Sequence, residues 1–175
     1  MVDSLAGNMN LVSKIYFPRE ILPIASVLAR LVDFLIGFGM LFIVMLYYKM
    51  PVNVVGWLFL PLVLITQIIL SLGLGFSGAA LNVFYRDVRH IFILGLQIWL
   101  YASPILYPIT AVPEQFRTIY FLNPMAGVIE AYRAILLQQG LPSFHIALSA
   151  GVALFVLVIG YGLFKKVEFQ FADVI

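Results

Sequence analysis

The ionisable residues of this chain that could do chemistry are few, and they fall into small groups at fixed spacings. The densest group is Arg86, Asp87, Arg89 and His90, which lies between two long stretches without charged side chains. Three more groups consist of opposite charges three residues apart, a spacing that places both members on one helix face and lets them pair. These pairs are Arg30 with Asp33, Glu114 with Arg117, and Glu130 with Arg133.

Sequence patterns for catalysis or metal binding are missing. The phosphate-loop pattern G-x-x-x-x-G-K-[ST] is absent, so this chain is not expected to hydrolyse ATP by itself. His90 and His145 are far apart, and neither HExxH nor clustered carboxylates suggest a metal site. Without cysteine there is no thiol nucleophile and no disulfide framework. We therefore expect a protein that is not an enzyme and has no cofactor of its own.

The composition places the chain among integral membrane proteins, because 63% of its residues are apolar and only 10% are charged. Its mean hydropathy is +1.08. About 20 apolar residues in a helix cross the roughly 30 Å of bilayer hydrocarbon. The sequence predicts an all-α membrane protein with about four transmembrane helices and short re-entrant helices. The four predicted spans run from residue 22 or 31 to 48, within 54–81, within 91–106, and over 144–164.

Residues 107–143 are too apolar for a plain loop and too interrupted for a span. Five prolines lie in or beside this segment, and each ends or kinks a helix: Pro104, Pro108, Pro113, Pro124 and Pro142. Between Pro124 and Gly140, apolar residues recur at helical spacing, which predicts a short amphipathic helix. We expect two short helices here that dip back into the interface or the protein on the outer side.

The distribution of lysine and arginine predicts the orientation, because cytoplasmic loops are enriched in them. With four spans, both termini share one side. That side would hold Lys14, Arg19, Arg86, Arg89, Lys165 and Lys166, and the other side Lys49, Arg117 and Arg133. Both termini are therefore predicted to be cytoplasmic.

The charged pairs each have two interpretations. Glu114–Arg117 and Glu130–Arg133 are either solvated pairs at the interface or parts of a gate at the outer mouth of a conduit. Ionisable groups inside a membrane cost about 2.5–3.5 kcal/mol each. Arg30 and Asp33 therefore either reach the cytoplasmic interface, with the helix beginning near Arg30, or lock their helix to a neighbour.

Small residues and aromatic residues gather in separate parts of the chain. The inner end of the second span has a cluster of small residues, and some of them, such as Ser71, Gly75 and Ala79, lie four apart, which predicts close packing of helices in a tight bundle or a dimer seam. The cluster consists of Ser71, Gly73, Gly75, Ser77, Gly78, Ala79 and Ala80. Six aromatic residues around the outer half of the third span and the segment after it are suited to anchoring at the membrane interface. Their rings could also stack on sugars. They are Trp99, Tyr101, Tyr107, Phe116, Tyr120 and Phe121.

Four blocks of sequence stand in an order that one family shares. They are residues 8–23 (NMNLVSKIYFPREILP), 82–90 (NVFYRDVRH), 99–108 (WLYASPILYP) and 122–133 (LNPMAGVIEAYR). Together they resemble the permease subunit of ABC-2 type polysaccharide exporters, which include O-antigen, teichoic-acid and capsule-type transporters. The resemblance covers essentially the whole chain.

This resemblance implies a homodimeric conduit in the bacterial inner membrane that moves lipid-linked polysaccharide to the outer face. The partners it implies are membrane lipids, a second permease copy and a separate ABC ATPase subunit that binds ATP and Mg. Nucleic acid is not among them. The implied parts of the single domain 1–175 are a cytoplasmic coupling segment (1–21), three spans (22–106), an outer gate segment (107–143), a last span (144–164) and a cytoplasmic tail (165–175).

The resemblance also implies roles for individual residues. Coupling to the ATPase is assigned to Asn8, Asn10, Lys14, Tyr16, Phe17, Pro18, Arg19 and Glu20. The cytoplasmic entrance is assigned to Tyr85, Arg86, Asp87 and Arg89, where the arginines could attract a lipid pyrophosphate or simply anchor the loop. The conduit and outer gate are assigned to Trp99, Tyr101, Pro104, Tyr107, Pro108, Asn123, Pro124, Glu130 and Arg133.

Such permeases normally carry an amphipathic helix and two more spans before the coupling segment. The chain therefore resembles the C-terminal two-thirds of a permease, either cut short or completed by a part supplied separately, and as it stands it is not expected to complete a sealed conduit. Two alternative functions stay open: a drug or small-molecule exporter of the same superfamily, and a non-transporting pore or scaffold without an ATPase.

Overall fold

The computed structural model describes residues 18–51, 53–85, 87–137 and 140–168. Within these ranges the ordered elements are all helices, which confirms the predicted fold class. They are α2 (Ile21–Tyr47), α3 (Val54–Trp57), α4 (Leu60–Phe84), α5 (Val88–Ala102), the 3-10 turn η2 (Ile109–Ala111), α6 (Glu114–Tyr120), α7 (Pro124–Leu136) and α8 (His145–Glu168).

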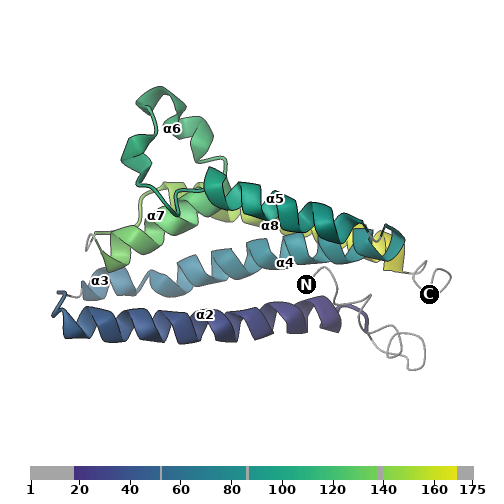
Figure 1. Cartoon of the computed structure of the whole chain (residues 1–175), viewed down its shortest axis with the longest axis horizontal. Coiled ribbons are helices and arrows are strands. Elements are labelled where there is room, and N and C mark those ends of the chain that lie inside the picture. The colour runs from purple at the N-terminus through teal and green to yellow at the C-terminus, as the bar shows by residue number, and fades with distance from the viewer. Residues whose placement is uncertain (1–17, 52, 86, 138–139, 169–175) are drawn as a thin grey trace.

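The four long helices run lengthwise through the molecule, and α6 projects from one side (Figure 1). We call the end of the bundle where α2 begins and α8 ends the Glu20 end. We call the opposite part of the bundle the Asn123 end; it contains the end of α2, the end of α5 and all of α7. Because α2 and α5 run toward the Asn123 end while α4 and α8 run away from it, the connection between α4 and α5 lies at the Glu20 end.

Three helical stretches in the described part of the chain are long and apolar enough to cross a membrane, namely Ile21–Tyr47, Val54–Phe84 and His145–Glu168. The third predicted span is a shorter apolar helix, α5, of 15 residues. It ends at Ala102 because Ser103 is extended (φ −99°, ψ 149°) before Pro104, whose ring disfavours helical backbone in the preceding residue. As a helix α5 is about 22 Å long, less than the hydrocarbon thickness.

Helices α4 and α8 pack with their backbones in contact. A Cβ atom added to Gly73 would lie 2.7 Å from the backbone nitrogen of Leu157, and one added to Gly160 would overlap the carbonyl oxygen of Gly73. The small residues of α4 thus serve close helix packing, as predicted. The contact with α8 runs through Gly73 of the predicted cluster and includes Ala79, which is buried with Phe164 of α8, whereas Ser71 is only half-buried.

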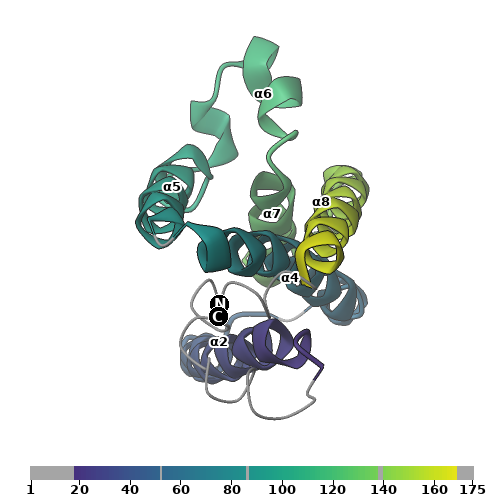
Figure 2. The same cartoon turned by 90° about the vertical axis from the view of Figure 1, so that its right-hand side faces the viewer.

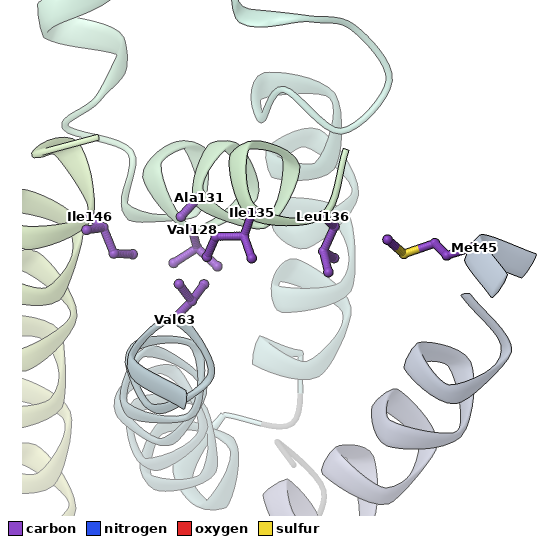
Figure 3. Close-up of a cluster of buried hydrophobic side chains, with 7 residues drawn as sticks. All are labelled: Met45, Val63, Val128, Ala131, Ile135, Leu136 and Ile146. Carbon is purple, nitrogen blue, oxygen red and sulfur yellow. The ribbon is translucent and has the colours of Figure 1, made fainter. Parts of the chain in front are cut away.

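Helix α7 is held against α4 and α8 by an apolar cluster at the Asn123 end. Figure 3 shows Val63 of α4 directed at Val128 and Ile135 of α7, with Ile146 of α8 beside them. Val63, Val128 and Ile135 are each at most 1% exposed. This buried face confirms the amphipathic helix predicted after Pro124. This packing also fixes the position of the polar side chains on the other face of α7.

Candidate functional site at the two ends of the bundle

At the Glu20 end, the residues just before α2 are bound to the last turns of α8. The carboxylate of Glu20 forms an ion pair with the ammonium of Lys165 and accepts a hydrogen bond from the Tyr161 hydroxyl at 3.2 Å. The guanidinium of Arg19 donates to the backbone carbonyl of Glu168, and Lys165 also lies 2.8 Å from the Glu168 carboxylate. The start of α2 and the end of α8 therefore lie at one level of the bundle.

Lys165 is the main influence on the pKa of the Glu20 carboxyl. The hydrogen bond from Lys165 is the largest influence and lowers the pKa of the Glu20 carboxyl. Partial burial opposes this shift, while the Tyr161 hydroxyl and the positive charge of Lys165 add to it. Glu20 is consequently a carboxylate at neutral pH, so the ion pair is fully formed there.

Only part of the predicted coupling segment is described. Pro18, Arg19 and Glu20 are seen, and two of them make the contacts with α8 just given. The other predicted residues, Asn8, Asn10, Lys14, Tyr16 and Phe17, lie outside the described residues. Sequence reasoning did not find Tyr161 and Lys165 as partners of Glu20. No local signal marks them, because about 140 residues separate them from it.

The predicted entrance residues lie in the tight connection between α4 and α5, also at the Glu20 end. Tyr85 is extended, and its carbonyl accepts a bond from the N–H of Val88 at 3.0 Å. Asp87 is the first residue before α5, and its carbonyl accepts from the N–H of His90. The side chains of Tyr85, Asp87 and Arg89 are exposed. Arg86 lies outside the described residues.

At the Asn123 end, one amide side chain joins the end of α5 to the start of α7. The Oδ1 atom of Asn123 accepts hydrogen bonds from the indole N–H of Trp99 at 2.8 Å and from the backbone N–H of Met125 at 3.0 Å. Its Nδ2 atom donates to the hydroxyl of Ser103, which is 2% exposed, at 2.9 Å. Asn123 is therefore the N-cap of α7, and Pro124 occupies the first helical position that tolerates proline.

Arg133 binds the non-helical segment that follows α5. Its guanidinium donates to the carbonyl oxygens of Ile105 and Tyr107, both at 3.0 Å, and lies 4.0 Å from the carboxylate of Glu130. The side chains of Arg133 and Glu130 are only 23% and 16% exposed. The interpretation of this pair as solvated is therefore wrong, because its arginine holds two protein segments together.

The other predicted gate pair is solvated. The guanidinium of Arg117 lies 3.4 Å from the Glu114 carboxylate, and the Glu114 side chain is 88% exposed. Arg117 also donates to the carbonyl of Val112 at 3.1 Å, a contact local to the α6 region. This pair stabilises the entry to α6 at most weakly, as exposed ion pairs generally do.

Two tyrosines connect α6 to the segment after α5. The hydroxyls of Tyr107 and Tyr120 are 2.6 Å apart, and the Tyr107 hydroxyl donates to the carbonyl of Tyr101 at 3.2 Å. Tyr120 then donates to Tyr107. Burial, and next the hydrogen bond to Tyr107, raise the pKa of the Tyr120 hydroxyl, so that it stays protonated and able to donate at neutral pH.

The structure brings most of the predicted gate residues into one network. Trp99, Tyr107, Asn123, Glu130 and Arg133 take part through side chains or backbone, as described above. Pro104 and Pro124 are buried beside them, whereas Pro108 and the side chain of Tyr101 face outward. Sequence reasoning missed Ser103, Ile105 and the bond of 2.9 Å from Tyr132 to Gln67 of α4.

These contacts position helices relative to one another. Among the residues that the structure describes, no group of three or more histidine, aspartate or glutamate side chains could hold a metal ion. The arrangement can instead transmit displacement, since Glu20 is tied to one end of α8 and α7 packs on the other. At that other end, the ring of His145 stacks on Phe121 with centroids 3.6 Å apart.

Comparison with known proteins adds the family. The profile of the ABC-2 type transporter family matches residues 6–137. This range includes the Asn123 network and, at the other end, Arg19 and Glu20, but not their partners in α8. The chain belongs to the ABC-2 type transporter family. Within this ABC-2 chain, the Asn123 network therefore lies in the part that defines the family.

The relatives of this ABC-2 chain include polysaccharide transporters. An O-antigen export system permease protein RfbA of Klebsiella pneumoniae is 28% identical over 173 residues, covering 98% of this chain and 66% of the relative. A protein of the same name from Myxococcus xanthus is 29% identical over 175 residues with the same coverage. The polysialic acid transport protein KpsM of Escherichia coli is 25% identical over 158 residues. The chain thus spans 66% of the length of these RfbA proteins.

Proposed function

We propose that this chain is the transmembrane permease subunit of an ATP-driven exporter that moves lipid-linked polysaccharide from the cytoplasmic to the outer face of the membrane. The observation that carries the proposal is the alignment of 98% of the chain with O-antigen export permeases. Membership of the ABC-2 type transporter family and the apolar helices support it.

In this proposal the energy comes from a separate ABC ATPase subunit that binds ATP and Mg. Residues 1–21 form the coupling segment that docks on this subunit. The contacts of Arg19 and Glu20 with the end of α8 support the role, because a displacement of the segment would pull directly on a membrane helix. The Asn123 network serves as the gate at the opposite end.

The proposed location is the bacterial inner membrane, with the Glu20 end and both termini in the cytoplasm. The lysines and arginines near this end support the orientation, since cytoplasmic ends are enriched in them. The complex is proposed to contain two copies of the permease. Helix α5 supports this, because none of its residues is buried within the described part of one copy.

The proposal is tested by producing the chain together with a candidate ATPase subunit in cells whose own permease gene is deleted. We expect the two proteins to co-purify and polysaccharide to reach the cell surface, as measured by immunoblotting. Export should stop when the ATPase carries a substitution that allows ATP binding but blocks hydrolysis.

Two results would contradict this function. Failure to co-purify with any ATPase would favour a pore or scaffold. Extrusion of small dyes without polysaccharide export would favour the small-molecule exporter.

A further inference from the structure

The ion pair between Glu20 and Lys165 determines how deep α2 lies in the membrane. Residues 146–164 of α8 contain no lysine, arginine, histidine, aspartate or glutamate, and about 20 such residues span the hydrocarbon. Lys165 follows this stretch directly and therefore marks one boundary of the hydrocarbon. Since Glu20 is bound to Lys165 and to Tyr161, Glu20 lies at the same boundary.

Arg30 and Asp33 consequently lie near the middle of the membrane. They follow Glu20 by ten and thirteen residues on a continuous helix, which places them about 15 and about 20 Å from the boundary. The hydrocarbon is about 30 Å thick, and the short side chain of Asp33 cannot reach either edge. The expectation that the helix begins near Arg30 is wrong, because α2 begins at Ile21. At the depths inferred here, neither group reaches the cytoplasmic interface.

These mid-membrane charges are largely uncovered by the rest of the described chain. Arg30 and Asp33 pair with each other at 3.1 Å, and their side chains are 77% and 63% exposed. They pair within α2, so this bond does not lock α2 to a neighbouring helix. Charged groups that faced lipid here would cost about 2.5–3.5 kcal/mol each, which is why such residues normally face a protein interior or a water-filled cavity.

The surroundings of the pair are polar along one face of α2. Ser26, Arg30, Asp33 and Gly37 follow one another at spacings of four, three and four residues, which places them on one face. We call these four residues the α2 polar face. None of its members is buried in the described structure.

The α2 polar face adjoins the side of α4 that leads to the Asn123 network. Arg30 lines a small hollow together with Gln67 and Ser71 of α4. Ser71 also lines a mostly apolar hollow of about 250 Å³ between α4 and α5, whose polar walls further include Trp99 and Ser103. Figure 2 shows α2 and α5 as separate helices that both flank α4. One side of α4 thus connects the charges with the two side chains that Asn123 binds.

We propose that the α2 polar face lines a water-filled path across the membrane and contacts the hydroxyl-rich chain that passes through it. Water satisfies the exposed ion pair, and sugar hydroxyls can replace that water because each donates and accepts hydrogen bonds. The path leads past Ser71 to Trp99 and Ser103. The nature of the passing chain rests on the proposed function, whereas the presence of water at this face does not.

Two glycines provide a matched test in this cysteine-free chain. Gly37 belongs to the α2 polar face, and Gly39 lies at nearly the same depth about 160° around the helix. A Cβ atom at either position meets open space, so Gly37→Cys and Gly39→Cys introduce thiols without disturbing packing. Each variant, in complex with its ATPase subunit in native membranes, is treated with a membrane-impermeant sulfonate methanethiosulfonate reagent.

Since only the hydrated thiolate reacts readily, we expect Gly37→Cys to be modified at least about tenfold faster than Gly39→Cys. Equally slow modification would overturn the proposal, because lipid or protein would then cover both positions. Equally fast modification would overturn it as well, since hydration would then not be confined to the α2 polar face.

A second variant tests the contact with the passing chain. The double substitution R30L/D33L replaces the ion pair with leucine. We expect the complex to assemble but to export at least about tenfold less polysaccharide, because the polar lining is lost. Unchanged export together with a higher melting temperature would show that the pair faces lipid and would overturn the proposal. If the unsubstituted chain exports no polysaccharide but Gly37→Cys still reacts rapidly, the proposed function fails while the water-filled path stands.

Discussion

At the scale of single residues, the side chain of Asn123 makes three hydrogen bonds that connect α5 and α7. Its side chain caps α7, accepts the Trp99 indole N–H and donates to Ser103. Two helices, α5 and α7, therefore depend on one amide. The sequence predicted Asn123 as a gate residue because it lies in the block 122–133, which resembles the polysaccharide-exporter permeases. Its three hydrogen bonds could not be predicted from the sequence, because they depend on how the helices pack.

Replacing Asn123 with alanine should destabilise the protein by about 2–3 kcal/mol, because the cap is lost and the buried hydroxyl of Ser103 loses its partner. We expect the melting temperature of the purified protein to fall by roughly 5–10 °C, as measured by thermal denaturation. Asn123→Asp is the matched control, since its carboxylate keeps both acceptor bonds and can accept from Ser103. An equal loss for both variants would contradict this assignment.

The lowered pKa of Glu20 leads us to expect that the stability of the protein depends on pH. Because its folded-state pKa lies below the ordinary value of 4.5, its ion pair contributes stability above that value and loses it as the pH falls through the lowered pKa. The melting temperature of the unsubstituted protein should exceed that of Glu20→Gln at pH 7. We expect this difference to shrink steadily below pH 4.5. Glu114→Gln controls for removing one exposed carboxylate, and a constant difference for Glu20→Gln across the pH range would exclude the ion pair as its cause.

At the scale of elements, α8 is the helix that touches both functional ends. It meets Glu20 near its C-terminus, α4 in its middle through Gly73 and Gly160, and α7 near its N-terminus. Such close backbone contact transmits movement because closely packed helices yield little. We infer that α8 and α4 move together as one unit.

A pair of glycines on α8 tests this packing. At Gly160 an added methyl group would meet the carbonyl of Gly73 and, at 2.7 Å, the hydroxyl of Ser77, whereas at Gly162 it would meet nothing. Gly160→Ala should therefore destabilise the protein by about 1–3 kcal/mol through overpacking. Gly162→Ala should be neutral or stabilising by up to about 1 kcal/mol, because alanine favours helix. The melting temperatures of the two variants, measured by thermal denaturation, test this prediction. Equal melting temperatures would show that α4 and α8 are not in backbone contact.

At the scale of the whole molecule, the described bundle leaves α5 without a buried residue, although most of its side chains are apolar. The chain also spans 66% of the length of its RfbA relatives. An apolar helix that makes so few contacts within one copy is suited to contact a further protein segment. This agrees with the proposed assembly from two permease copies.

Helix α5 should lie close to its counterpart in a second copy. Gly95 of α5 and Gly151 of α8 both have open space at the position of a Cβ atom. In oxidised native membranes we expect Gly95→Cys to form a disulfide-linked dimer, seen by non-reducing electrophoresis, and Gly151→Cys to remain monomeric. If only Gly151→Cys formed dimers, the interface between the two copies would involve α8 and the assignment to α5 would be wrong.

The sequence by itself determined the membrane class, the long apolar helices and the amphipathic helix α7, because these depend on hydrophobicity and on periodicity within one segment. The third span was predicted to reach as far as residue 106, and the structure placed the end of α5 at Ala102, ahead of Pro104. The tertiary structure alone decided which distant residues meet. Glu20 and Lys165 are brought together by the antiparallel packing of whole helices, and from that contact we infer that Arg30 and Asp33 lie near the middle of the membrane. No local pattern encodes such a depth, since it follows from how one helix is aligned along another.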